Sequence, residues 1–114
     1  MPPPGTAFWP IGAHPWVVVS RTIKGKVLAV NMTDADHCPD STCKLNVGDH
    51  PCITKPSAIY YKKAREFDAA KIDQELSSGK NAKKLAPCSQ QLLNKIIRGA
   101  RDADDLTARF RDYL

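Results

Sequence analysis

The sequence predicts an α+β domain in which a small β-barrel of five or six short strands is followed by two or three C-terminal helices. The first half is rich in β-branched and aromatic residues, interrupted by Gly, Pro and Asp clusters as in short strands and turns. In the second half the apolar residues recur at helical spacing. Small curled sheets of this kind tend to close into barrels. We therefore expect one domain over residues 1–114, with the barrel at about 5–67 and the helical part at about 68–114.

The strands are expected where short apolar runs lie between turn residues. The clearest, residues 15–20 (PWVVVS), is apolar without interruption, which predicts burial on both faces. A hairpin loop at 21–26, a polar surface loop at 33–42 and a tight turn at 48–51 (GDHP) separate the strands. The expected strands are 6–9, 15–20, 26–31, 43–46 and 57–61, and residues 64–67 extend or follow the last of them.

The helices are expected from their end signals. Asp68 can cap a helix that runs to about residue 78 and stops at Gly79. Ser89 can cap a second helix, whose apolar stripe comprises Leu92, Leu93, Ile96, Ile97 and Ala100. A last short helix is expected to start at Asp104 or Asp105, with Leu106, Phe110 and Leu114 facing inward.

Composition bears on the cellular location of the protein and on the kind of partner it can bind. The net charge is +5, from 17 Lys/Arg and 12 Asp/Glu, and a positive field attracts polyanions such as nucleic acid, although a solvated lysine-rich surface would look the same. No apolar run is long enough to span a bilayer, and no leader segment is visible, so we expect a cytoplasmic protein with no membrane contact. Its four cysteines (Cys38, Cys43, Cys52, Cys88) are then expected as free thiols.

The order of the motifs resembles a known family. An X-Pro step leads into WVVVS, then a hairpin, VNMT, GDHP, SAIYYKKAREFD and the terminal helices. This order is similar to the PemK/MazF toxins, whose fold is an SH3-like barrel. It also resembles small uncharacterised bacterial proteins with the same VN-x-T and C-x-L-N-x-GDHP segments. The barrel likeness covers about residues 5–70, and the second group is similar over nearly the whole chain.

The resemblance implies a toxin-type endoribonuclease that cleaves single-stranded RNA without a metal or cofactor, by attack of the RNA's own 2′-hydroxyl. It also implies an antitoxin partner and a homodimer. The family places an arginine before the proline of the second strand, where this chain has His14, and a threonine or serine where it has Thr33. Two further family positions, an arginine and an aspartate, here read Tyr60 and Lys62. We therefore assign His14 and Thr33 as catalytic candidates.

The candidate RNA-binding residues are Tyr60, Lys62, Asp49 and His50. Tyr60 can stack on an unpaired base and Lys62 can supply positive charge, whereas Asp49 and His50 can equally shape their own turn.

Three alternatives remain open at this stage. Because two family positions are replaced, the chain could be a catalytically silent barrel that binds nucleic acid or protein. The cysteines and histidines between residues 37 and 52 are irregularly spaced for structural zinc, so no metal ligands are assigned. Cys43 could act as a nucleophile with His14 or His50 as its base.

Overall fold

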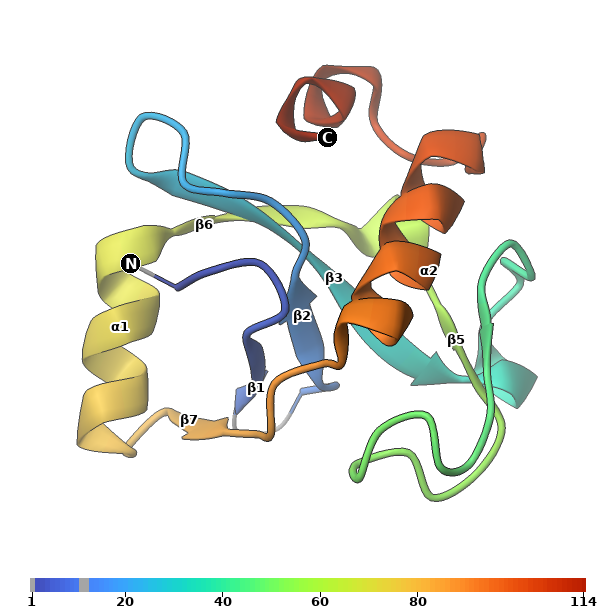
Figure 1. The fold of residues 1–114 in the computed structure, drawn as a ribbon, viewed down its shortest axis with the longest axis horizontal. Helices are drawn as coiled ribbons and strands as arrows, with labels where there is room; N and C mark the ends of the chain where they lie inside the picture. The colour runs from blue at the N-terminus through green and yellow to red at the C-terminus, as the bar shows by residue number, and fades with distance from the viewer. Residues whose placement is uncertain (1, 11–12) are drawn as a thin grey trace.

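The computed structural model describes residues 2–10 and 13–114, in which one antiparallel sheet is flanked by helices (Figure 1). Six of its seven strands follow the order β4-β5-β3-β2-β1-β7, and the seventh, β6, pairs with β3 off this path. The strands are β1 (Ala7–Pro10), β2 (Trp16–Val18), β3 (Lys26–Asp34), β4 (Lys44–Leu45), β5 (Ser57–Ile59), β6 (Arg65–Asp68) and β7 (Ala82–Lys84). The helices are α1 (Ala69–Ser78) and α2 (Gln90–Asp102), with short 3-10 turns η1 (Ala35–His37), η2 (Tyr61–Lys63) and η3 (Ala108–Tyr113).

The nine-residue strand β3 is the centre of the sheet. Along one edge it pairs with β2, and along the other it pairs first with β6 and then with β5. The turn η2 bridges β5 and β6, so that both strands lie against the same edge of β3. The predicted end of this strand at residue 31 is wrong, because pairing with β5 continues it to Asp34.

Apolar residues are buried on both faces of the sheet. On one face Val17, Val19 and Leu28 pack with α2 and η3, and on the other Trp16 and Val18 pack with α1. Alternate residues of β2 thus belong to opposite clusters, which confirms the double burial that its unbroken apolar run predicts.

The predicted closed barrel is not observed, whereas the α+β class is confirmed. The terminal strands β4 and β7 do not pair with each other, and the sheet stays open. The physical reason lies in the two helices: each covers one face, so the apolar side chains of both faces are removed from water without the sheet closing on itself.

Both long helices have the expected ends. The Asp68 carboxylate accepts the amide of Ala70 at 3.1 Å, and Gly79 ends α1 with φ of 69°. The Ser89 hydroxyl accepts the amide of Leu92 at 3.1 Å. The expected third helix is instead the 3-10 turn η3, which begins after Thr107 rather than at Asp104 or Asp105.

Among the residues that the structure describes, we find no helix that combines the length and the apolar character of a membrane span.

Candidate functional site

Two polar residues lie near the C-terminal end of β3. They are on the same face of the sheet that α1 covers near the N-terminal end of this strand. The apolar cluster under α1 includes Val27 and Ala29, and the next side chains on that face are Asn31 and Thr33. Thr33 is only 5% exposed, and its hydroxyl donates to the Asn31 side-chain oxygen at 2.9 Å. The hydroxyl proton is therefore engaged within the protein, and the oxygen lone pairs remain for a ligand donor.

His14 lies across from Thr33 at the start of β2. Trp16 pairs with Asn31, and the Met32 amide donates to the Pro15 carbonyl at 2.9 Å, which extends the ladder by one residue. The same register places His14 opposite Thr33. His14 is exposed. The pKa of the neighbouring Asp34 is lowered, chiefly by its hydrogen bond with Lys55 and further by the charges of His37 and His14.

Tyr60 directly follows β5, the strand that pairs with β3 along the edge opposite to β2. Ala58 pairs with Thr33, and the Tyr60 amide donates to the Asn31 carbonyl at 3.3 Å, so Tyr60 continues the same face. The ring is half-buried, and the Lys63 ammonium lies 5.9 Å from its centroid. Lys63, rather than the predicted Lys62, is thus the lysine that accompanies this ring. Lys62 is exposed on η2.

Arg65 adds a cation that the sequence does not mark as a site residue. It pairs with Ala29 across β6 and β3, and a directly opposed pair shares one face. Its guanidinium is exposed and lies 5.3 Å from the centroid of the Phe67 ring. Only the register of β6 on β3 reveals this position.

We call this set of side chains the polar face. It comprises His14, Asn31, Thr33, Tyr60, Lys63 and Arg65.

The neighbouring Tyr61 points away from the polar face. It is fully buried, and its hydroxyl donates to the Ile96 carbonyl of α2 at 2.7 Å. Burial raises the pKa of this phenol far above its ordinary value. Tyr61 therefore connects η2 to α2, and only Tyr60 of the two tyrosines can meet a ligand at the polar face.

Asp49 and His50 do not join the polar face. The Asp49 carboxylate accepts the amide of Asn46 at 2.8 Å and shapes the turn. His50 is buried, accepts the Cys52 amide at its Nδ1 (3.1 Å) and donates from Nε2 to the Ala86 carbonyl (2.6 Å). Both ring nitrogens are thus used inside the protein, and the imidazole ties this turn to the segment before α2.

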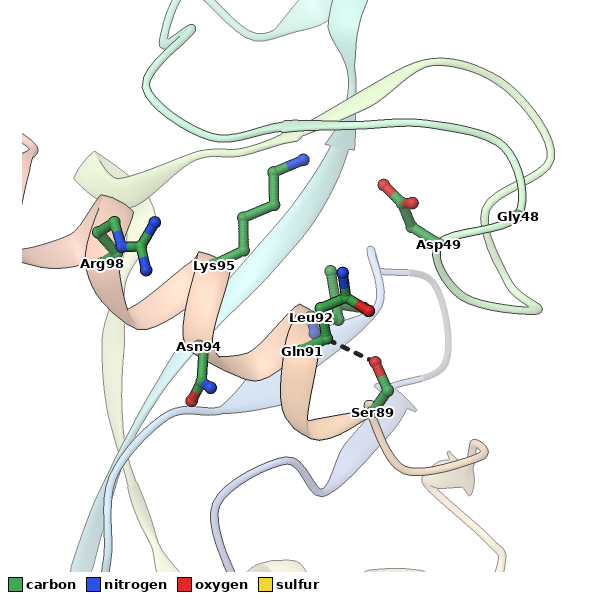
Figure 2. A pocket seen from close by; sticks show the side chains of 8 residues that line it. All are labelled: Gly48, Asp49, Ser89, Gln91, Leu92, Asn94, Lys95 and Arg98. Atoms are coloured by element: carbon green, nitrogen blue, oxygen red, sulfur yellow. Dashed lines mark hydrogen bonds between the residues drawn. The ribbon is translucent and has the colours of Figure 1, made fainter.

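A polar groove of about 740 Å³ lies between the 48–51 turn and α2 (Figure 2). Asp49 lines one side, and Lys95 and Arg98 line the other. The Lys95 ammonium donates to the Lys44 carbonyl. Because α2 packs on the face of the sheet opposite to α1, this groove is separate from the polar face.

The geometry does not support a catalytic cysteine or a metal site among the described residues. The described cysteines are free thiols, and burial raises the pKa of the Cys43 thiol, which disfavours the thiolate that a nucleophile needs. Cys52 Sγ lies 3.0 Å from His50 Nδ1. Within residues 2–10 and 13–114, no group of three or more His, Cys, Asp or Glu side chains could hold a metal ion.

Comparison with solved structures shows a fold of the MazF type. The chain is similar to a chain of the MazE-MazF (Form-II) crystal structure from Deinococcus radiodurans, with a TM-score of 0.58 and 14% sequence identity. The match covers 93% of this chain and 97% of that chain. No family profile and no curated protein matches the sequence. At this identity the likeness shows the fold alone.

Proposed function

We propose that the protein is a toxin-type endoribonuclease that cleaves single-stranded RNA without a metal, and that the polar face is its site. The observation that carries the proposal is the strand register, which sets His14 opposite Thr33 and adds Tyr60 and Arg65 to the same face. An imidazole can transfer the protons that cleavage requires, cations can stabilise the charge on the phosphate, and an aromatic ring can stack on an unpaired base.

The chemistry can be assigned to this chain's own groups. His14, in its neutral form, removes the proton from the 2′-hydroxyl, and the oxygen attacks the adjacent phosphorus. The bond from phosphorus to the 5′-oxygen breaks, and that oxygen takes a proton from the imidazolium or from water. The products are a 2′,3′-cyclic phosphate and a 5′-hydroxyl end.

The remaining groups of the polar face position the RNA strand and stabilise the charge that develops on its phosphate. Because the Thr33 proton is directed to Asn31, the Thr33 oxygen can accept a hydrogen bond from another donor of the RNA and help to position the strand, while the 2′-hydroxyl proton goes to His14. Arg65 and Lys63 supply positive charge where negative charge develops on the phosphate oxygens. The family has an arginine at the position of His14, and a histidine is a poorer fixed cation than an arginine. Arg65 and Lys63 can supply this positive charge instead.

The test is cleavage of a labelled single-stranded RNA in buffer with a chelator. Wild type is expected to release 5′-hydroxyl fragments, and His14→Ala to lower the rate by about 10²- to 10⁴-fold. His37→Ala is the matched control, because His37 is also exposed but lies on η1 beyond the end of β3. RNA left intact by wild type, or equal rates for His14→Ala and His37→Ala, would contradict the proposal.

One observation favours a second candidate, a module that binds RNA or protein without cleaving. Thr33 is 5% exposed and already hydrogen-bonded, which suits a structural strand residue. Under this reading Tyr60→Ala and Arg65→Ala weaken RNA binding, Thr33→Ala leaves it unchanged, and no fragments form. Arg98→Ala on α2 is the control, because it removes the same charge on the opposite side of the sheet.

We also propose an antitoxin partner and a homodimer. The fold match to the MazE-MazF crystal structure supports the antitoxin partner, and the resemblance to the PemK/MazF toxins, which implies a homodimer, supports the dimer. Light scattering of the purified chain would test the dimer, and a mass of a monomer across the micromolar range would contradict it. Co-purification with the product of a neighbouring gene would test the partner.

A further inference from the structure

A small apolar pocket lies directly beside the polar face, between α1 and the sheet. Its volume is about 190 Å³, which is below the range for drug-sized ligands and suits a group as small as one planar ring system. Its lining includes residues of β1, β2, β6 and α1: Phe8, Trp16, Arg65, Phe67, Glu75 and Leu76.

Three aromatic rings form its walls. The Phe67 ring meets Phe8 at 5.5 Å and 90°, and meets Trp16 at 5.1 Å and 75°, both edge to face. Such contacts fix the orientation of Phe67, so the walls are preformed. Flat heteroaromatic groups bind to surfaces of this kind by stacking.

Two charged side chains of opposite sign complete the lining. Arg65 lies over the Phe67 ring, and Glu75 is half-buried on α1, one turn after Ile72. The guanidinium disfavours a cationic ligand, and the apolar walls disfavour a bare phosphate. A neutral planar ligand that offers acceptors to Arg65 and donors to Glu75 satisfies both.

The pocket is continuous with the polar face. Ala13 of its rim precedes His14, Trp16 follows two residues after His14 on the same strand face, and Arg65 belongs to both sets. A strand with a phosphate at His14 therefore has a flanking base within reach of the pocket.

We propose that this pocket binds one unpaired guanine base of the RNA strand, an inference that rests on the proposed function. Guanine presents N1–H and N2–H donors to the Glu75 carboxylate, and O6 and N7 acceptors to the Arg65 guanidinium. Its ring stacks against the aromatic walls, as in sites that read an extruded base by its edge.

The test uses single-stranded pentamers with 2′-fluoro sugars, which lack the attacking hydroxyl and cannot be cleaved. Four pentamers carry G, A, C or U at the central position, and fluorescence anisotropy measures their binding to the full chain. We expect the G pentamer to bind about tenfold more tightly than the other three.

Two variants probe the pocket without touching His14, Thr33 or Arg65. Glu75→Gln removes the negative charge and replaces one of the two acceptor oxygens with an NH2 donor, and is expected to lower affinity for the G pentamer about tenfold, with little effect on the others. Leu76→Trp fills the pocket and is expected to abolish the preference. Asp105→Asn, which removes the same charge from an exposed site outside the pocket, is expected to behave as wild type.

Equal affinity for the four pentamers, or a G preference that both variants retain, would overturn the inference. If the protein cleaves RNA but binds the four pentamers equally, the guanine proposal is wrong and the proposed cleavage stands. A preference that Glu75→Gln abolishes, in a protein that leaves RNA intact, would support the pocket and overturn the proposed cleavage.

Discussion

Gly99 of α2 packs directly against the side chains of Tyr61 in η2 and of Cys43 just before β4. A Cβ atom there would lie 2.3 Å from the Tyr61 hydroxyl oxygen and 3.1 Å from Cys43 Cβ. The hydroxyl cannot simply withdraw, because it donates to the Ile96 carbonyl at 2.7 Å and its ring is fully buried. Gly99→Ala should therefore force the two elements apart.

The size of the effect follows from three contributions. Alanine gains about 1 kcal/mol over glycine inside a helix. Overpacking a core costs about 1–3 kcal/mol, and displacing the tyrosine leaves a buried hydroxyl without its partner at a further cost of about 1–3 kcal/mol. The net expectation is a loss of about 3 kcal/mol, or a Tm lowered by roughly 10 °C for a chain of this size.

Urea unfolding followed by circular dichroism measures the effect, and Tyr61→Phe provides the internal control. Removing the hydroxyl should cost about 1 kcal/mol by itself. In that background Gly99→Ala should become nearly neutral, because the 2.3 Å contact is gone and the remaining contacts are no closer than 3.1 Å. A Gly99→Ala variant as stable as wild type, or effects that simply add in the double variant, would refute the reasoning.

Three further predictions concern other contacts. His50→Ala removes hydrogen bonds to the Ala86 carbonyl and the Cys52 amide and should cost about 2 kcal/mol in urea unfolding; an unchanged midpoint would contradict it. The pKa of Glu66 is lowered, chiefly by the hydrogen bond from Tyr113, so its stabilisation is present above about pH 4.5 and is lost as the pH falls through the folded-state value. Wild type should then lose more stability than Glu66→Gln between about pH 5 and 3, and parallel curves would count against this. Burial raises the pKa of Cys88 to about 11, so iodoacetamide at pH 8 should label it roughly a hundredfold more slowly in the folded chain than in urea, as peptide mapping would show.

Features with local causes could be predicted from the sequence. Asp68, Gly79 and Ser89 act through the backbone groups within a few residues, so their roles at the helix ends are visible in the sequence itself. The apolar run in β2 likewise predicts burial on both faces, because no polar residue interrupts it.

Features with non-local causes were missed. The strand β7 (Ala82–Lys84) has no apolar alternation, and it forms because its backbone pairs with β1, with Lys83 opposite Trp9. A short lysine-bearing strand at the edge of a sheet is stabilised by its partner rather than by its own sequence. The open sheet is not predicted either, because helices that cover both of its faces bury the apolar side chains without closure, and no local sequence signal shows this coverage.

The candidate site also contains residues that local sequence signals predict and residues that depend on non-local pairing. The positions of His14 and Thr33 follow from an X-Pro step and a strand end, which are local signals. Arg65 depends on how β6 aligns with β3 after the turn η2, and no sequence pattern fixes that register. The sequence offers His50 either a role in its own turn or a binding role, and only the position of the Ala86 carbonyl shows that its ring is engaged inside the protein.

One strand serves both the core and the candidate site, which makes the two interdependent. On the face that α1 covers, β3 presents Val27 and Ala29 and then changes to Asn31 and Thr33. Because the apolar half is packed against α1, the polar half cannot shift its register without moving every side chain to the other face. The hydrogen bond between Asn31 and Thr33 is therefore held in place by core packing rather than by a ligand. A polar face built this way is organised before any ligand binds, so binding does not carry a further entropic cost for ordering it.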